Sequence, residues 1–139
     1  GDTAAPAQEH EVGKGRVIYL SGDVGATLNS FHTAEFHTLI ENVVARLAPP
    51  DVQLENAPGS LELVVRSQDN GRRLLIHLVN FTGEMTRPIR RVIPVENLRI
   101  RLPRAYSKAH TLVQARQVPV RGAELTIAKV NEYEVVVVE

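Results

Sequence analysis

The chain has 139 residues and a hydrophobic content of 43%, which suits one ordinary domain or one domain with an appendage. It has no cysteine, and this excludes disulfide bridges, thiolate metal sites and cysteine catalysis. The formal net charge is zero, but nine of the sixteen acids lie in residues 1–62 and twelve of the sixteen bases lie in residues 63–121. This asymmetry predicts either an anionic partner or, as we favour, neutralisation of the basic middle by the acidic ends.

The first residues, GDTAAPAQEHEVGK, are small, polar and interrupted by proline and glycine. Such a composition predicts a flexible arm over residues 1–14. No apolar run approaches the roughly 18–20 residues of a membrane span, and no signal-peptide core is present. We therefore expect a cytoplasmic protein without a membrane partner.

Residues 15–50 are predicted to form one strand–helix segment. RVIYL is β-branched and aromatic, as is typical of a buried strand, and the stretch SGDVG after it raises the question of a phosphate-binding loop. Only Gly22 and Gly25 are present, and no lysine follows them, so both the dinucleotide fingerprint and the Walker loop are incomplete. We interpret the stretch as a glycine turn and predict no cofactor.

The helix is predicted from TAEFHTLIENVVARL, with Thr33 as N-cap and Pro49-Pro50 as the stop. On this prediction it begins eight residues after Gly25, too far to meet a phosphate held by the glycines. Six apolar residues form one stripe at helical spacing: Phe36, Leu39, Ile40, Val43, Val44 and Leu47. Each contributes roughly 1.5–3 kcal/mol when buried, so the stripe needs a cover. We predict that it is a packing or oligomerisation surface, covered by the rest of the chain, a second copy or an upstream domain.

From residue 51 onward the apolar period changes from 3.6 to 2. About seven short strands are predicted, in VQLEN, SLELVVRSQ, RRLLIHLVNF, ENLRIRLP, HTLVQAR, AELTIAK and EYEVVVVE. Asn70-Gly71 is a strong signal for a tight hairpin, because both residues tolerate a positive φ. Regularly spaced short strands of this kind predict an antiparallel β-sandwich over residues 51–139.

Two longer stretches resemble a known family. GKGRVIYLSGDVGATLNSFHTAEFHTLIENVVARL resembles the closing βα segment of the amidotransferase-like middle domain, also called the trimerisation domain, of β-galactosidase-type glycosidases. APGSLELVVRSQDNGRRLLIHLVNFTGEMTRPIRRVIPVENLRIRLP and the ending YEVVVVE resemble the C-terminal β-sandwich of uncharacterised bacterial glycoside hydrolases of that architecture. The resemblance covers residues 13–139, with RLLIHLVNFTG and RPIRRVIP as its most specific parts. One departure is His32-Thr33, where the family tends to place a His-Pro pair.

The resemblance implies a non-catalytic C-terminal part of a glycosidase-like protein. In that family the catalytic carboxylates lie on the strands of a barrel, and this chain contains no barrel sequence. No catalytic residue is therefore transferred to it.

The histidines and acids form no recognisable catalytic or metal site. His32 and His37 are five residues apart, whereas zinc pairs on a helix need three or four. His77 is interpreted as a half-buried histidine bonded to the backbone or to another layer, and not as a catalytic base. Glu132 and Glu134 lie on one strand face about 7 Å apart, as a glycosidase pair can, but we interpret them as solubilising acids on a half-solvated strand.

A basic run lies between Arg87 and Lys108. Its candidate anion-binding residues are Arg87, Arg90, Arg91, Arg99 and Arg101. Nucleic-acid binding needs interleaved aromatic residues for stacking, and only Tyr106 is nearby, so a nucleic-acid partner is disfavoured. The low aromatic content also weakens carbohydrate binding, although a carbohydrate partner stays open.

These patterns predict a chain that is not itself an enzyme and has no catalytic, cofactor-binding or metal-binding residue. We expect an accessory or assembly module of a glycoside-hydrolase-like protein, with an upstream domain or a second copy as its partner. The alternative is a binding module for an anionic polysaccharide or nucleic acid that uses the Arg87–Arg104 face.

Overall fold

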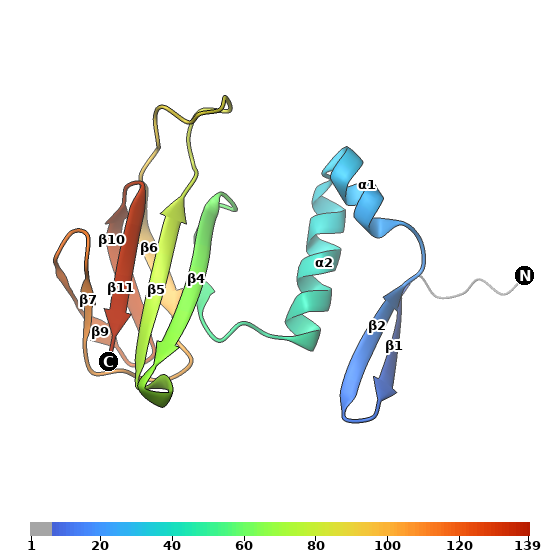
Figure 1. Cartoon of the computed structure of the whole chain (residues 1–139), viewed down its shortest axis with the longest axis horizontal. Coiled ribbons are helices and arrows are strands. Elements are labelled where there is room, and N and C mark those ends of the chain that lie inside the picture. The colour runs from blue at the N-terminus through green and yellow to red at the C-terminus, as the bar shows by residue number, and fades with distance from the viewer. Residues whose placement is uncertain (1–6) are drawn as a thin grey trace, which may run out of the picture. The chain divides into compact units, whose positions relative to one another are not determined.

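The computed structural model describes residues 7–139. They fall into two compact units that divide between Pro50 and Asp51, called here the N-terminal unit and the sandwich unit. The described strands form three antiparallel sheets, one in the N-terminal unit and two in the sandwich unit (Figure 1). The predicted fold class, a mainly β chain with a sandwich and a strand–helix segment before it, is confirmed.

The N-terminal unit begins with a β-hairpin of β1 (Ala7–Val12) and β2 (Gly15–Leu20). Gly13 takes φ +60°, as a two-residue hairpin turn requires at that position. The expectation of a flexible arm is therefore wrong for residues 7–14, and its residues 1–6 lie outside the described part. The polar run AQEHEV was not predicted as a strand because its side chains carry no strand signal. It forms one because β2 supplies its backbone hydrogen-bond partners.

Two helices follow, α1 (Val24–Phe31) and α2 (Ala34–Leu47). The sequence predicted only the second, with the observed N-cap at Thr33 and an end just before Pro49. In α1, the carboxylate of Asp23 accepts a hydrogen bond from the Ala26 amide at 3.0 Å. The helix therefore starts directly after Gly22, and the expectation of a late helix start is wrong.

This correction does not restore a phosphate site. The capping carboxylate of Asp23 already accepts from an amide at the helix N-terminus and places a negative charge there. The strand that leads into the loop belongs to an antiparallel hairpin, whereas nucleotide-binding loops of this kind follow a strand of a parallel sheet.

The sandwich unit consists of a four-stranded and a five-stranded sheet. The first has the order β3 (Gln53–Leu54), β6 (Val95–Arg101), β10 (Glu124–Val130), β9 (Val120–Arg121). The second has the order β4 (Leu61–Gln68), β5 (Arg73–Asn80), β11 (Tyr133–Val138), β7 (Ala109–Thr111), β8 (Gln117–Val118). A short 3₁₀ turn, Asp69–Gly71, joins β4 to β5, and Asn70 and Gly71 have positive φ as predicted.

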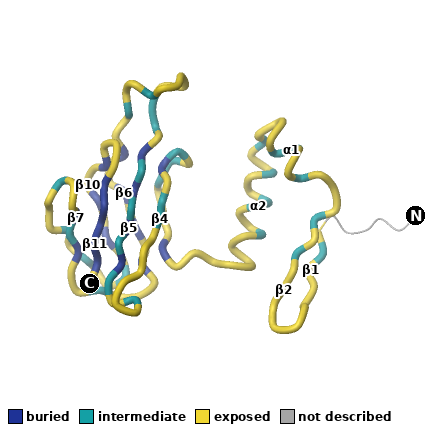
Figure 2. Tube along the Cα trace, in the orientation of Figure 1, coloured by how far each residue is buried: buried dark blue, intermediate teal, exposed yellow. Residues whose placement is uncertain are grey.

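The hydrophobic core lies between the two sheets. Alternate residues of each strand point inward, and the most deeply buried are Ile76, Leu78, Leu98, Ile100, Val130, Val136 and Val138. Figure 2 shows the buried positions along the strands of the sandwich unit. In the N-terminal unit, by contrast, residues 7–50 include no buried residue.

Candidate functional site

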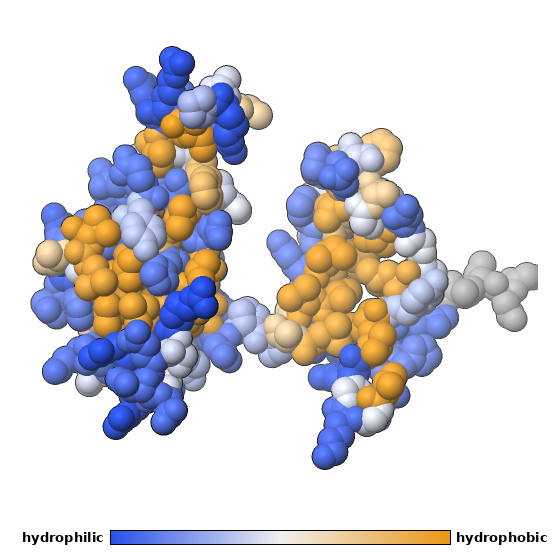
Figure 3. Space-filling model, in the orientation of Figure 1, coloured by the Kyte–Doolittle hydropathy of each residue, from blue (hydrophilic) through white to orange (hydrophobic). Residues whose placement is uncertain are grey.

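The apolar stripe lies on α2, and its neighbours in the N-terminal unit cover it only in part. Four of its residues are half-buried, and Val44 and Leu47 have exposed fractions of 52% and 40%. Within this unit α2 lies against α1 and β2, and these two short elements supply little surface. The structure thus leaves the stripe as a partly open apolar surface (Figure 3).

The hairpin exposes a second apolar surface. Val17 and Tyr19 on β2 point to one face, opposite His10 and Gln8 of β1, and both are exposed. Ile18 and Leu20 point to the other face and are half-buried. A strand with apolar residues on both faces is typical of a sheet covered on both sides, and this unit covers one face only in part.

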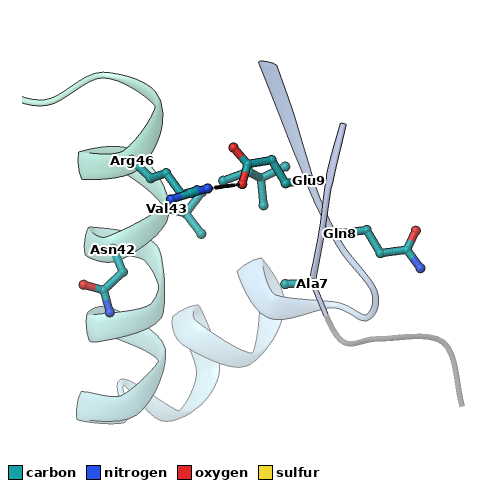
Figure 4. Close-up of a pocket in the computed structure, with 7 residues that line it drawn as sticks. Ala7, Gln8, Glu9, Asn42, Val43 and Arg46 are labelled. Atoms are coloured by element: carbon teal, nitrogen blue, oxygen red, sulfur yellow. Dashed lines mark hydrogen bonds and ion pairs between the residues drawn. The ribbon is translucent and has the colours of Figure 1, made fainter. Parts of the chain in front are cut away.

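A pocket of about 270 Å³ lies between the hairpin and α2. Its lining residues are Ala7, Gln8, Glu9, Ile18, Asn42, Val43 and Arg46. Ile18 and Val43 make it apolar. An ion pair closes one side, with Arg46 from α2 and Glu9 from β1 pointing toward each other at 2.6 Å (Figure 4).

The ion pair also sets the charges at this pocket. The hydrogen bond from Arg46 lowers the pKa of Glu9, with the charges of Arg46 and Arg16 adding to the effect and desolvation opposing it. The same bond raises the pKa of Arg46. The pair links β1 to α2. Because both side chains are solvent-accessible, it adds little to stability.

The candidate anion-binding residues do not form one free surface. Arg99 and Arg101 lie on β6 and both form ion pairs with Glu55, the first at 3.7 Å. Arg101 is also 4.0 Å from Glu124. Glu55, from the acidic residues 1–62, and Glu124, near the C-terminus, therefore neutralise this part of the basic run.

Arg104 is also held within the sandwich unit. Its guanidinium donates to the Gly71 carbonyl at 2.7 Å and lies 4.3 Å from the centre of the Tyr106 ring. Tyr106, the aromatic residue nearest the basic run, is thereby occupied. Because the ring is also partly buried against the core, little of it is free to stack on a base or a sugar.

Arg87, Arg90 and Arg91 lie elsewhere, on the long loop between β5 and β6, and all three are exposed. Figure 1 shows this loop extending beyond the ends of the strands. Met85 is fully exposed on the same loop. The structure thus separates the five candidate residues into two paired arginines on a strand and three exposed ones on a loop.

The base of this loop is well held. Gly83 bridges Val92, and a Cβ at position 83 would lie 2.4 Å from the Arg91 carbonyl oxygen, so a side chain there would force the two segments apart. The buried Asn80 side chain donates to the Ile93 and Asn131 carbonyls at 2.9 and 2.8 Å. The loop therefore presents its arginines from a fixed base.

Glu134 is the polar residue whose environment the sequence analysis misjudged. β11 is a central strand, and Glu134 has an exposed fraction of 0%. Its carboxylate accepts hydrogen bonds from the Val113, Gln114 and Val135 amides at 2.8, 3.1 and 2.9 Å. The four valines that follow Glu134 were the available signal, because a run that is apolar on both faces is typical of a strand covered on both sides.

Glu132, by contrast, is exposed. The carboxylate of Glu134 is buried and holds a turn, whereas that of Glu132 is exposed. The two therefore do not form a paired acid site. His77 accepts or donates one hydrogen bond through Nδ1 with the Tyr133 hydroxyl at 2.7 Å, and the two rings stack at 6.2 Å. The predicted half-burial is correct, but the bonding partner is a side chain on the adjacent strand of the same sheet and not the backbone or another layer.

Among residues 7–139, no group of three or more histidine, aspartate or glutamate side chains is placed to hold a metal ion. Over the same residues, no helix combines the length and apolarity that a membrane crossing requires.

Comparison with known proteins supports the fold. No family model matches the chain, and no curated protein matches it. Among solved structures it is similar to the α-L-fucosidase isoenzyme 2 from Paenibacillus thiaminolyticus, with a TM-score of 0.71 and 18% identity over 88% of this chain. The match spans only 20% of the fucosidase chain. At this identity the likeness shows the fold alone: this chain folds like part of that fucosidase, and the match does not point to the β-galactosidase type specifically.

Proposed function

We propose that this chain is a non-catalytic accessory module of a glycoside-hydrolase-like protein, and that the stripe on α2 packs against a further domain of that protein. The observation behind the proposal is the lack of any buried residue in residues 7–50. A unit with six stripe residues and a two-sided apolar strand has material for a core but no second layer to complete it.

The energetic argument follows from the exposed stripe. Full burial of one such side chain is favourable by roughly 1.5–3 kcal/mol, so a partner that completes the burial of the six adds several kcal/mol. This is a large fraction of the net stability of a domain, which is about 5–15 kcal/mol. Covering the stripe is therefore the main gain that assembly offers this unit.

The fucosidase match supports the choice of partner. The fucosidase chain is about five times longer than its matched part, so a fold like this one occurs there within a much longer protein. We propose a similar setting here. The sequence resemblance to β-galactosidase-type proteins would make residues 15–50 the end of the preceding middle domain, and a second copy of the chain is the other candidate cover.

The test is to introduce a charge into the stripe. Ile40→Asp and Val44→Asp, alone and together, are expected to raise the solubility of the 139-residue chain and to reduce its association in size-exclusion chromatography. Thr38→Asp is the matched control, because it places the same charge on an exposed position of α2 outside the stripe. If solubility and particle size stay the same in the double variant, the stripe is not a packing surface.

We keep anion binding as a second proposal, restricted to the β5–β6 loop. The described residues form no ion pair with Arg87, Arg90 or Arg91, and the loop holds the three from a fixed base. The expected signature is heparin binding that weakens steeply with salt and is lost when the three become glutamine. Flat titrations with heparin and single-stranded DNA would remove this proposal.

A further inference from the structure

β4 has one unpaired side. It is the edge strand of the five-stranded sheet, and among the described residues only β5 pairs with it. It is eight residues long, whereas β3, the edge strand of the other sheet on the β6 side, has only two residues. A long edge strand of this kind is a template for pairing with another strand.

The hydrogen-bond ladder shows which backbone groups point outward. The Phe81 amide donates to the Ser60 carbonyl at 2.9 Å, and this pair continues the β4–β5 register. Bonded and non-bonded pairs alternate in an antiparallel ladder, so Glu62, Val64 and Arg66 direct their backbone groups to β5. The backbone groups of Leu63, Val65 and Ser67 therefore face the open edge.

The side chains of β4 are self-complementary. Glu62, Val64 and Arg66 lie on the outer face of the sheet, and Leu63 and Val65 lie on the inner face. If a second β4 pairs antiparallel with its centre at Val64, Glu62 lies opposite Arg66 of the second copy, and Arg66 lies opposite Glu62 of that copy. The same alignment places Leu63 opposite Val65 of the second copy.

The backbone allows this alignment. It makes the Leu63–Val65 pairs hydrogen-bonded pairs, and these are the residues whose amides and carbonyls face the edge. Neighbouring alignments centred on Leu63 or Val65 also satisfy the backbone. However, they place Glu62 and Arg66 opposite uncharged residues, so only the Val64-centred one forms two charge pairs.

We propose that two copies of the chain associate through β4, antiparallel and centred on Val64, into one continuous sheet. The interface is isologous, as in most homodimers. It covers Val65, whose exposed fraction is 37%, and closes the longest open edge of the sandwich unit. The proposal does not depend on the α2 stripe or on the proposed function.

The first test is cross-linking with a single cysteine, which is unambiguous because the chain contains none. Val64→Cys places two thiols opposite each other at a non-hydrogen-bonded pair, where Cα atoms are about 4.5 Å apart and a disulfide can form. We expect a disulfide-linked dimer under mild oxidation. Arg66→Cys is the control, since its opposite residue is Glu62 and no self-linked dimer should form.

An equimolar mixture of Glu62→Cys and Arg66→Cys chains should link to each other. If Val64→Cys stays monomeric, or if Arg66→Cys links to itself as readily, the proposed alignment is wrong. If a strand other than a second β4 pairs with this edge, Val64→Cys also stays unlinked, and the proposal is overturned.

The second test exchanges the charges. Glu62→Arg or Arg66→Glu alone places like charges opposite each other at both symmetric positions, so the dimer Kd should rise at least about tenfold in analytical ultracentrifugation. The double variant restores the opposite pairs and should return the Kd close to that of the original chain. A monomeric original chain, or a double variant as weak as the single ones, would contradict the proposal. Ile40→Asp in the stripe should leave the disulfide cross-linking of Val64→Cys unchanged, because that cross-link reports the β4 contact alone, so the two proposals fail separately.

Discussion

The two units of this chain both have regular apolar patterns, and they differ in what those patterns pack against. In the sandwich unit, alternate residues of two sheets meet and bury each other, with Ile76, Leu98 and Val136 close to zero exposure. In the N-terminal unit, α2 and β2 also carry apolar residues, but their main neighbours within the unit are each other, the polar strand β1 and the short helix α1. The apolar pattern of a sequence therefore predicts which face of an element is apolar, whereas the burial of that face depends on a second layer of comparable size.

The largest expected contrast comes from the same substitution in each unit. Ile76→Ala removes a fully buried side chain between two sheets and should lower the free energy of unfolding by about 2–5 kcal/mol. Ile40→Ala removes a half-buried side chain from the stripe and should cost about 1 kcal/mol or less at low protein concentration. Urea unfolding followed by circular dichroism measures both. Equal losses would mean that the stripe is already part of a complete core.

An intermediate effect is expected at the buried carboxylate. Glu134→Gln keeps the size of the side chain but directs an amide group toward backbone donors, so the free energy of unfolding should fall by about 1–3 kcal/mol. Glu132→Gln, at the exposed residue just before β11, is the control and should change the free energy of unfolding by less than about 0.5 kcal/mol. If both substitutions are neutral in the same urea titration, Glu134 does not hold the turn at Val113–Gln114.

The smallest effect is expected at the Glu9–Arg46 pair. The pKa of Glu9 is lowered in the folded unit, so its contribution is present above the ordinary glutamate pKa of about 4.3 and is lost as the pH falls through the lowered value. Limited proteolysis of the N-terminal unit should therefore accelerate slightly below that pH. The Glu9→Gln chain should cleave at one rate from pH 6 to pH 3. A pH dependence that persists unchanged in Glu9→Gln would assign the effect to other acids.

The sequence predicted the elements whose signal is local. β6 alternates from Leu98 onward, Asn70-Gly71 defines a hairpin, and the proline pair follows the C-cap of α2 directly. The elements it missed depend on partners. β1 is polar and becomes a strand because β2 pairs with it, and α1 contains a glycine in its first turn but has an Asp23 cap.

The candidate sites show the same limit. The charge distribution predicted neutralisation in general, but not that Glu55 would pair with both Arg99 and Arg101. The burial of Glu134 was predicted wrongly because it depends on the order of the strands in the sheet. Local sequence predicts where a strand lies in the chain but not that order. The open edge of β4 likewise followed only from the observed sheet order.

Amide hydrogen exchange of the 139-residue chain at low concentration compares the two units in one experiment, because it reports protection residue by residue. We expect strong protection in β5 and β11 and protection at least about a hundredfold weaker in α2 and β2, and the difference should narrow when a partner covers the stripe. Equal protection of the two units in the isolated chain would contradict this expectation.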